Sequence, residues 1–74
     1  MNKQELVRRL ERYGITMSNN TLGTGIVLYE DCLVFTQHDF TYSLAYEDII
    51  ATGFYCNVLT LQGKRFTYQI GGNK

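Results

Sequence analysis

Hydrophobic and polar residues alternate most regularly between residues 40 and 46. Every second position there is aromatic or aliphatic, at Phe40, Tyr42, Leu44 and Tyr46. Since successive side chains of a strand point to opposite faces, the pattern predicts a half-buried β-strand with one aromatic and aliphatic face. Glu47 and Asp48 then form a charged corner, and the apolar run resumes at Ile49.

Short apolar runs separated by turn-forming residues predict further strands after residue 21. These strands are predicted at residues 25–29, 32–37, 49–56, 58–61 and 65–70. The turns between them are predicted at residues 30–31, 38–39, 57 and 62–64. Gly53 lies inside one of the runs and predicts a bulge or bend there. No helical pattern interrupts the strands, so the sheet is expected to be antiparallel.

A different periodicity marks the first residues of the chain. Apolar side chains recur at helical spacing, at Leu6, Val7, Leu10 and Tyr13. Charged residues occupy most of the other positions, so residues 3–13 are predicted to form an amphipathic helix. A helix of this length is marginal in water and needs a surface to pack on.

Both ends of this helix carry capping signals. Asn2 is a favoured N-cap residue, and Glu5 stands three positions later, which is the spacing of a capping box. Gly14 is placed to adopt the left-handed conformation after the last turn. Ile15 is then expected to contact Leu10, as in a Schellman ending.

Together these elements predict an α+β fold in a single domain, residues 1–74. The N-terminal amphipathic helix is expected to pack on a strongly bent five- to six-stranded antiparallel sheet or partial barrel, built from residues 22–70. Residues 71–74 are expected to be a flexible tail. The chain contains no proline, a residue that often protects sheet edges. An unprotected edge is a place where a partner's strand can add.

Composition excludes several classes of protein. No apolar run reaches the ~20 residues of a membrane-spanning helix, and no secretory signal opens the chain. We therefore expect a cytoplasmic protein without membrane contact. Cys32 and Cys56 are predicted to be buried free thiols, and a disulfide between them requires Cα atoms within about 7 Å. With a single histidine the chain has no zinc signature, so no metal or cofactor is expected.

The charges cancel over the chain but are distributed unevenly. Residues 1–12 hold four basic and two acidic side chains. Residues 13–63 hold five acids and no Lys or Arg, and residues 64–74 hold three basic residues. This pattern is interpreted as neutralisation of the sheet by the two ends of the chain. The alternative is two faces of opposite sign, one of which attracts a partner.

Candidate catalytic groups are sparse. Two pairs of adjacent acids, at residues 30–31 and 47–48, are interpreted as solvated turns because neighbouring side chains diverge. His38 stands beside Asp39, but no serine or cysteine nucleophile can be assigned to them. The chain is therefore not expected to be an enzyme. An enzyme would require His38 and an acid pair in one pocket.

The order of features from residue 25 onward resembles that of small bacterial PH-like (GRAM-like) domains. The corresponding residues are an early hairpin at residues 26–36, the segment Leu44-Ala45-Tyr46-Glu47-Asp48-Ile49, and a last hairpin with Gly63-Lys64-Arg65-Phe66. The resemblance covers about residues 25–70 and implies a bent antiparallel sheet. The chain departs from the family in placing its helix at the N-terminus, where PH-like domains have a C-terminal helix. No binding residue is carried over from the family.

These observations predict a non-enzymatic protein–protein interaction module that binds another protein or a second copy of itself. A small inhibitor or adaptor, for example one encoded by a phage or mobile element and acting on a host protein, fits this description. The alternative is a nucleic-acid-binding module that uses the helix arginines and the basic turn at residues 64–65, which requires both on one face. Tyrosines that could stack on bases are interpreted as core residues, at Tyr42, Tyr46, Tyr55 and Tyr68. Candidate partner-binding residues are Arg8, Arg9, Arg12, Tyr42, Tyr46, Glu47, Asp48, Tyr55, Lys64 and Arg65.

Overall fold

One helix and two three-stranded antiparallel sheets make up the computed structural model, which describes residues 1–71. The helix α1 spans Lys3–Arg12. The first sheet contains β1 (Gly25–Leu28), β2 (Cys32–Gln37) and β3 (Phe40–Ala45) in that order, and the second contains β4 (Ile49–Tyr55), β5 (Val58–Gly63) and β6 (Thr67–Gly71). The tail expected at residues 71–74 lies outside the described residues, apart from Gly71.

The α+β class is confirmed, but the prediction of one five- to six-stranded sheet is wrong. A short 3₁₀ turn, η1 (Tyr46–Asp48), connects β3 to β4 at the charged corner. The turn redirects the chain, so β3 and β4 do not pair, and each becomes an edge of its own sheet. The two sheets do not close into a barrel.

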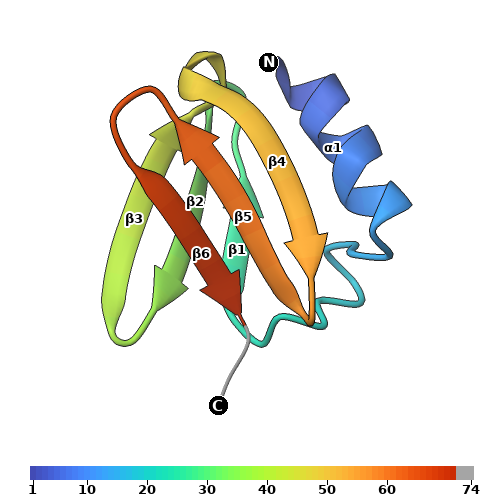
Figure 1. The fold of residues 1–74 in the computed structure, drawn as a ribbon. Coiled ribbons are helices and arrows are strands. Elements are labelled where there is room, and N and C mark those ends of the chain that lie inside the picture. The colour runs from blue at the N-terminus through green and yellow to red at the C-terminus, as the bar shows by residue number, and fades with distance from the viewer. Residues whose placement is uncertain (72–74) are drawn as a thin grey trace.

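The core lies between the inner faces of the two sheets (Figure 1). In the first sheet the register places Ile26 and Phe35 side by side, and in the second it aligns Leu59 with Ile70. All four side chains are buried. Alternate residues of each strand therefore face the core, as the period of two requires.

Helix α1 covers the side of the molecule where β4 and β1 form the sheet edges (Figure 1). Its Leu6 and Leu10 are buried in the common core. Tyr13 stacks on Phe54 of β4 with ring centroids 5.6 Å apart, and its hydroxyl lies 2.8 Å from the Thr52 hydroxyl. The helix thus fills one of the two openings between the sheets.

Both helix ends follow the local signals in the sequence. The Glu5 amide donates to Asn2 Oδ1 over 2.8 Å, and the Ile15 amide donates to the Leu10 carbonyl over 2.8 Å in a Schellman ending. Gly14 has a φ of 86° there. The capping box is only half formed, because the Glu5 carboxylate accepts from Arg9 Nε at 3.1 Å. That hydrogen bond lowers the pKa of Glu5.

Two hairpin turns use residues whose left-handed conformation was not predicted. His38 and Asp39 connect β2 to β3, and Cys56 and Asn57 connect β4 to β5, all with φ between 53° and 68°. Positive φ at both central residues gives the turn twist that suits tight hairpins. Cys56 is therefore exposed in a turn, so its prediction as a buried strand residue is wrong. Cys32 is half-buried, and both thiols are free.

The irregularity in the second sheet does not lie at the position that the sequence predicted. The register shift lies between Ile49 and Ala51, whereas Gly53 pairs regularly with Thr60. The predicted bulge at Gly53 is therefore wrong. The last hairpin loop follows β5 directly and is closed by the Gly63 amide, which donates to the Phe66 carbonyl over 2.8 Å.

The alternating stretch at residues 40–46 is buried only at its end. Phe40 at the start of β3 is 64% exposed, whereas Leu44 is buried. β3 is an edge strand, and its first four residues are exposed. Tyr46 belongs to η1, not to the strand, and it is buried, so its ring is not presented on the surface.

Replacing Tyr46 with phenylalanine is expected to lower the free energy of unfolding by about 1 kcal/mol at neutral pH. The Tyr46 hydroxyl donates to the Tyr29 carbonyl over 2.7 Å, and the variant leaves this acceptor without its partner. Burial, with the nearby Cys32, Glu30 and Asp31, raises the pKa of Tyr46. Urea titrations followed by circular dichroism at neutral and alkaline pH measure both effects.

The raised pKa also gives Tyr46 an expected pH dependence. Above about pH 10 the unfolded chain loses the phenolic proton while the folded chain keeps it, so stability falls as pH rises. The loss of stability that Tyr46 causes at alkaline pH should be absent from Tyr46→Phe. It should be present in Tyr55→Phe, because Tyr55 is 81% exposed. An equally steep alkaline loss in Tyr46→Phe and the wild type would contradict the assignment.

Candidate protein-binding cleft

The opening between the sheets that lies opposite α1 is bordered by β3 and β6 (Figure 1). Among the strands of residues 1–71, each of these two pairs with a single neighbour. At one end, the side chain of Gln37 bridges the opening. Its Nε2 donates to the Gln69 carbonyl over 3.0 Å, and its Oε1 accepts from the Gly71 amide over 2.7 Å. The side-chain amide of Gln37 thus makes the two hydrogen bonds that a neighbouring strand would make, and it covers the last part of the β6 edge.

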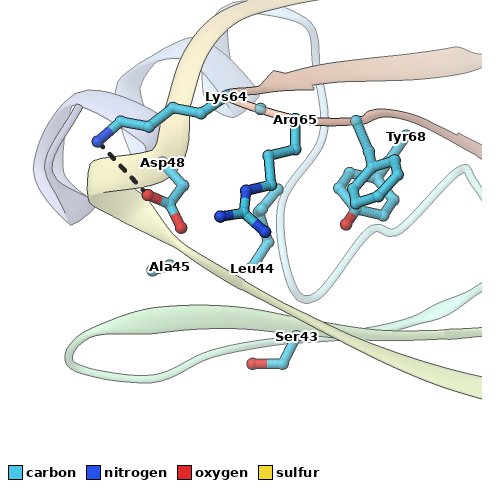
Figure 2. Close-up of a pocket in the computed structure, with 9 residues that line it drawn as sticks. Ser43, Leu44, Ala45, Asp48, Lys64, Arg65 and Tyr68 are labelled. Carbon is cyan, nitrogen blue, oxygen red and sulfur yellow. Dashed lines mark ion pairs between the residues drawn. The ribbon is translucent and has the colours of Figure 1, made fainter.

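The other end of this opening is a cleft of about 430 Å³, which we call the β3–β6 cleft (Figure 2). Its walls come from the end of β3, from η1, from the β5–β6 loop and from β6. The lining residues are Ser43, Leu44, Ala45, Asp48, Gly63, Lys64, Arg65, Phe66 and Tyr68.

Three charged side chains line the β3–β6 cleft. Lys64 Nζ lies 3.7 Å from Asp48 Oδ1, and both side chains are largely exposed, so this ion pair contributes little stability. Figure 2 shows the Arg65 side chain directed across the cleft toward β3, between Asp48 and Tyr68. Among residues 1–71, no carboxylate forms an ion pair with Arg65. The cleft therefore presents one guanidinium without an ionic partner.

Aromatic rings lie along the border between the two sheets. Buried Phe35 stacks on Tyr42 of β3 at 5.0 Å and meets Tyr68 of β6 edge-on at 5.9 Å. Tyr42 and Tyr68 lie 6.2 Å apart across the opening. Phe66, at the end of the loop, is 65% exposed. The cleft thus combines an apolar rim with a cation.

Neither β3 nor β6 carries the residues that usually prevent strand addition at a sheet edge. β3 and β6 contain no proline and no charged side chain. Because the Gln69 carbonyl and the Gly71 amide point out of the sheet toward Gln37, the period of two places the backbone groups of Thr67 on the same outer edge. Gln37 covers only the end of β6 that lies away from the cleft.

The structure brings some of the predicted partner-binding residues together. Asp48, Lys64 and Arg65 line the cleft, and Tyr42 adjoins it through Tyr68. The other predicted residues lie elsewhere. Tyr55 is exposed at the end of β4, so its interpretation as a core residue is wrong. Glu47 lies in a separate hollow with Glu30, Asp31 and residues 1–3.

The helix arginines and the basic turn at residues 64–65 do not form one basic face. Arg8 and Arg9 both pair with Glu5, at 3.3 and 3.1 Å, and Arg9 also donates to Thr52. In Figure 1, α1 lies beyond β4, whereas the β5–β6 loop lies on the opposite side, near β3. The nucleic-acid-binding alternative requires the helix arginines and this turn on one face, and this arrangement does not meet that condition.

Several cleft residues were not identified from the sequence. The candidate partner-binding residues did not include Ser43, Leu44, Ala45, Gly63 or Phe66, and Tyr68 was interpreted as a core residue. A usable signal was present, because the segments 40–45 and 67–71 contain neither charge nor proline. That signal becomes informative only once both segments are known to be edge strands.

The surroundings of His38 show no acid pair. His38 lies in a hollow with residues 22–24, Thr36, Gln37 and Gly71, none of which is acidic. Residues 1–71 contain no group of three or more side chains suited to holding a metal ion. Within the same residues, no helix is long and apolar enough to cross a membrane. Comparisons of the chain with family models, with curated proteins and with solved structures found no match.

Proposed function

We propose that the chain is a non-enzymatic protein-binding module that takes an extended segment of a partner protein into the β3–β6 cleft. The observation that carries this proposal is the pair of uncharged, proline-free edge strands that border one opening between the sheets. Such edges offer backbone donors and acceptors to an added strand. A small inhibitor or adaptor acts in this way when it occupies a strand of its target.

The side chains of the cleft also fit a peptide better than a nucleic acid. Affinity for a phosphate backbone comes from several cations acting together. Here the lining includes two cations and one acid, and Lys64 is already paired with Asp48. Tyr68, Phe66 and Leu44 supply contact area for the apolar side chains of a peptide. Aromatic residues and arginine are enriched among the residues that dominate binding energy in protein interfaces.

The test begins with a random heptapeptide display library selected on the immobilised full-length chain. Selected peptides are synthesised and titrated into ¹⁵N-labelled protein, and the amide signals are followed by NMR. We expect the largest shift changes in β3 and β6, from which the peptide forms backbone hydrogen bonds. A single-stranded dodecanucleotide is titrated in parallel. Binding of the oligonucleotide with no selected peptide acting on β3 or β6 would overturn the proposal.

Thr67→Pro is expected to weaken peptide binding at least about fivefold, the loss of roughly one backbone hydrogen bond. Thr67 is the first residue of β6, a strand position that tolerates proline, and its amide lies on the outer edge. The matched control, Thr67→Val, keeps the amide and should bind as the wild type does. Equal weakening by both variants would contradict strand addition.

Self-association is tested with the same protein in the absence of peptide. Spectra recorded over a hundredfold range of protein concentration report whether a second copy occupies the edges. Concentration-dependent shifts confined to β3 and β6 would mean that the cleft accepts a second copy, which would contradict the proposal of a different partner.

A further inference from the structure

We infer that the segment bound in the β3–β6 cleft is acidic, with a Glu or Asp carboxylate paired to Arg65. This inference rests on the proposed function, because it assigns a chemical class to the occupant of the same cleft. It commits to one ligand chemistry: an extended peptide that carries one acid beside an apolar residue.

The charges around the cleft select for a carboxylate. Asp48, Lys64 and Arg65 are its charged residues, and the pair between Lys64 and Asp48 neutralises two of them. Arg65 is left as the cation without an ionic partner among residues 1–71. A ligand carboxylate would give the cleft a balanced charge, whereas a basic ligand would add a second uncompensated cation beside Arg65.

The direction of Arg65 makes this pairing specific. Its side chain crosses the cleft toward β3 (Figure 2). A peptide that occupies the cleft would therefore contact the guanidinium. A guanidinium presents a rigid fork of donors that matches a carboxylate in two parallel hydrogen bonds. Leu44 and Tyr68 also line the cleft, and contact with them would exclude water from one side of such a pair and so strengthen it.

The neighbours of Arg65 also position the rest of the ligand. Asp48 lies on the η1 side of the cleft, where Lys64 is already paired with it and is not free for a second carboxylate. On the opposite side, Phe66 is 65% exposed and Tyr68 is half-buried, so both rings are accessible to an apolar side chain. The acid of the ligand is therefore expected between Asp48 and the aromatic rings, next to an apolar residue that contacts them.

A double-mutant cycle on the protein and the peptide tests the inference. The probe is an acetylated and amidated heptapeptide from the display selection that contains one Glu, compared with the same peptide with Gln in that place. Each is titrated by calorimetry at low salt against the wild type and Arg65→Gln. We expect either single change to weaken binding about tenfold, and the two together to weaken it little further.

Arg12→Gln is the matched control, because Arg12 is an exposed arginine of α1 outside the cleft and the variant removes the same charge. This variant should leave the difference in affinity between the Glu peptide and the Gln peptide unchanged. Selected peptides without an acid, or equal effects of Arg65→Gln on both peptides, would overturn the inference while shifts in β3 and β6 would still support the proposed function. Selected peptides that perturb neither strand would overturn both.

Discussion

Replacing Phe35 with alanine is expected to lower the free energy of unfolding by about 3–5 kcal/mol, the range found for large aromatic side chains in protein cores. Phe35 lies in β2 between Ile26 and Tyr42 in register, and it is 1% exposed. It also meets Tyr68 of the second sheet edge-on. The variant therefore leaves a cavity at the point where the two sheets contact each other. Urea titration followed by far-ultraviolet circular dichroism measures the loss.

Because the protein is small, this loss is large relative to its total stability. A domain of this length has a stability of the order of 5–10 kcal/mol, so the variant is expected to lose a large part of it. Thr36→Ala is the matched control, because Thr36 is the next residue of the same strand and is exposed. Its effect should stay within about 0.5 kcal/mol. Similar losses in the two variants would mean that the inward face of β2 is not as assigned.

The helix could be predicted almost completely because its signals are local. Asn2, Gly14 and the apolar stripe lie within a few residues of the groups they act on. Their hydrogen bonds form in the predicted places, and the helix ends at Arg12, one residue earlier than predicted. Capping depends only on the conformation of the residues next to each helix end, so the sequence is sufficient to predict it.

The arrangement of the strands could not be predicted in the same way. A period of two states which side chains share a face, but it does not state which strands are neighbours. The strands in this chain were located to within a few residues, yet their grouping depends on η1. Glu47 and Asp48 were recognised as a corner, but a corner can continue a bent sheet or begin a second one. In the structure, Tyr46 and Ile49 pack in the core at the two ends of this corner.

The cleft follows from that grouping, which explains why only its charged residues were anticipated. Asp48, Lys64 and Arg65 were selected for their charge, and the structure places them on one cleft. Ser43 and Phe66 join them only because β3 and β6 are edges on the same side of the molecule. Long-range pairing decides which strands are edges, so the local lack of charge and proline in these segments could not locate the site by itself.

Gly71→Ala is expected to lower the free energy of unfolding by about 2–5 kcal/mol, from a backbone cost and a steric cost together. Gly71 ends β6 with a φ of 89°, a conformation that an L-residue rarely adopts. A Cβ there would lie 2.8 Å from the Asn57 carbonyl oxygen and 2.8 Å from a methyl group of Leu22. Leu22 is a core residue, so it cannot move away freely. Urea titration measures the change.

Two other glycines separate the two costs. Gly14 has a φ of 86°, but a Cβ at this position would meet only open space, so Gly14→Ala should lose only the backbone term, about 1–2 kcal/mol. Gly53 has neither feature, and Gly53→Ala should change stability by no more than about 0.5 kcal/mol. The excess loss in Gly71→Ala over Gly14→Ala then measures how tightly Leu22 and Asn57 enclose the end of β6. If that excess is absent, this part of the core yields to a methyl group, and the hydrogen bonds by which Gln37 covers the β6 edge are not held by rigid packing.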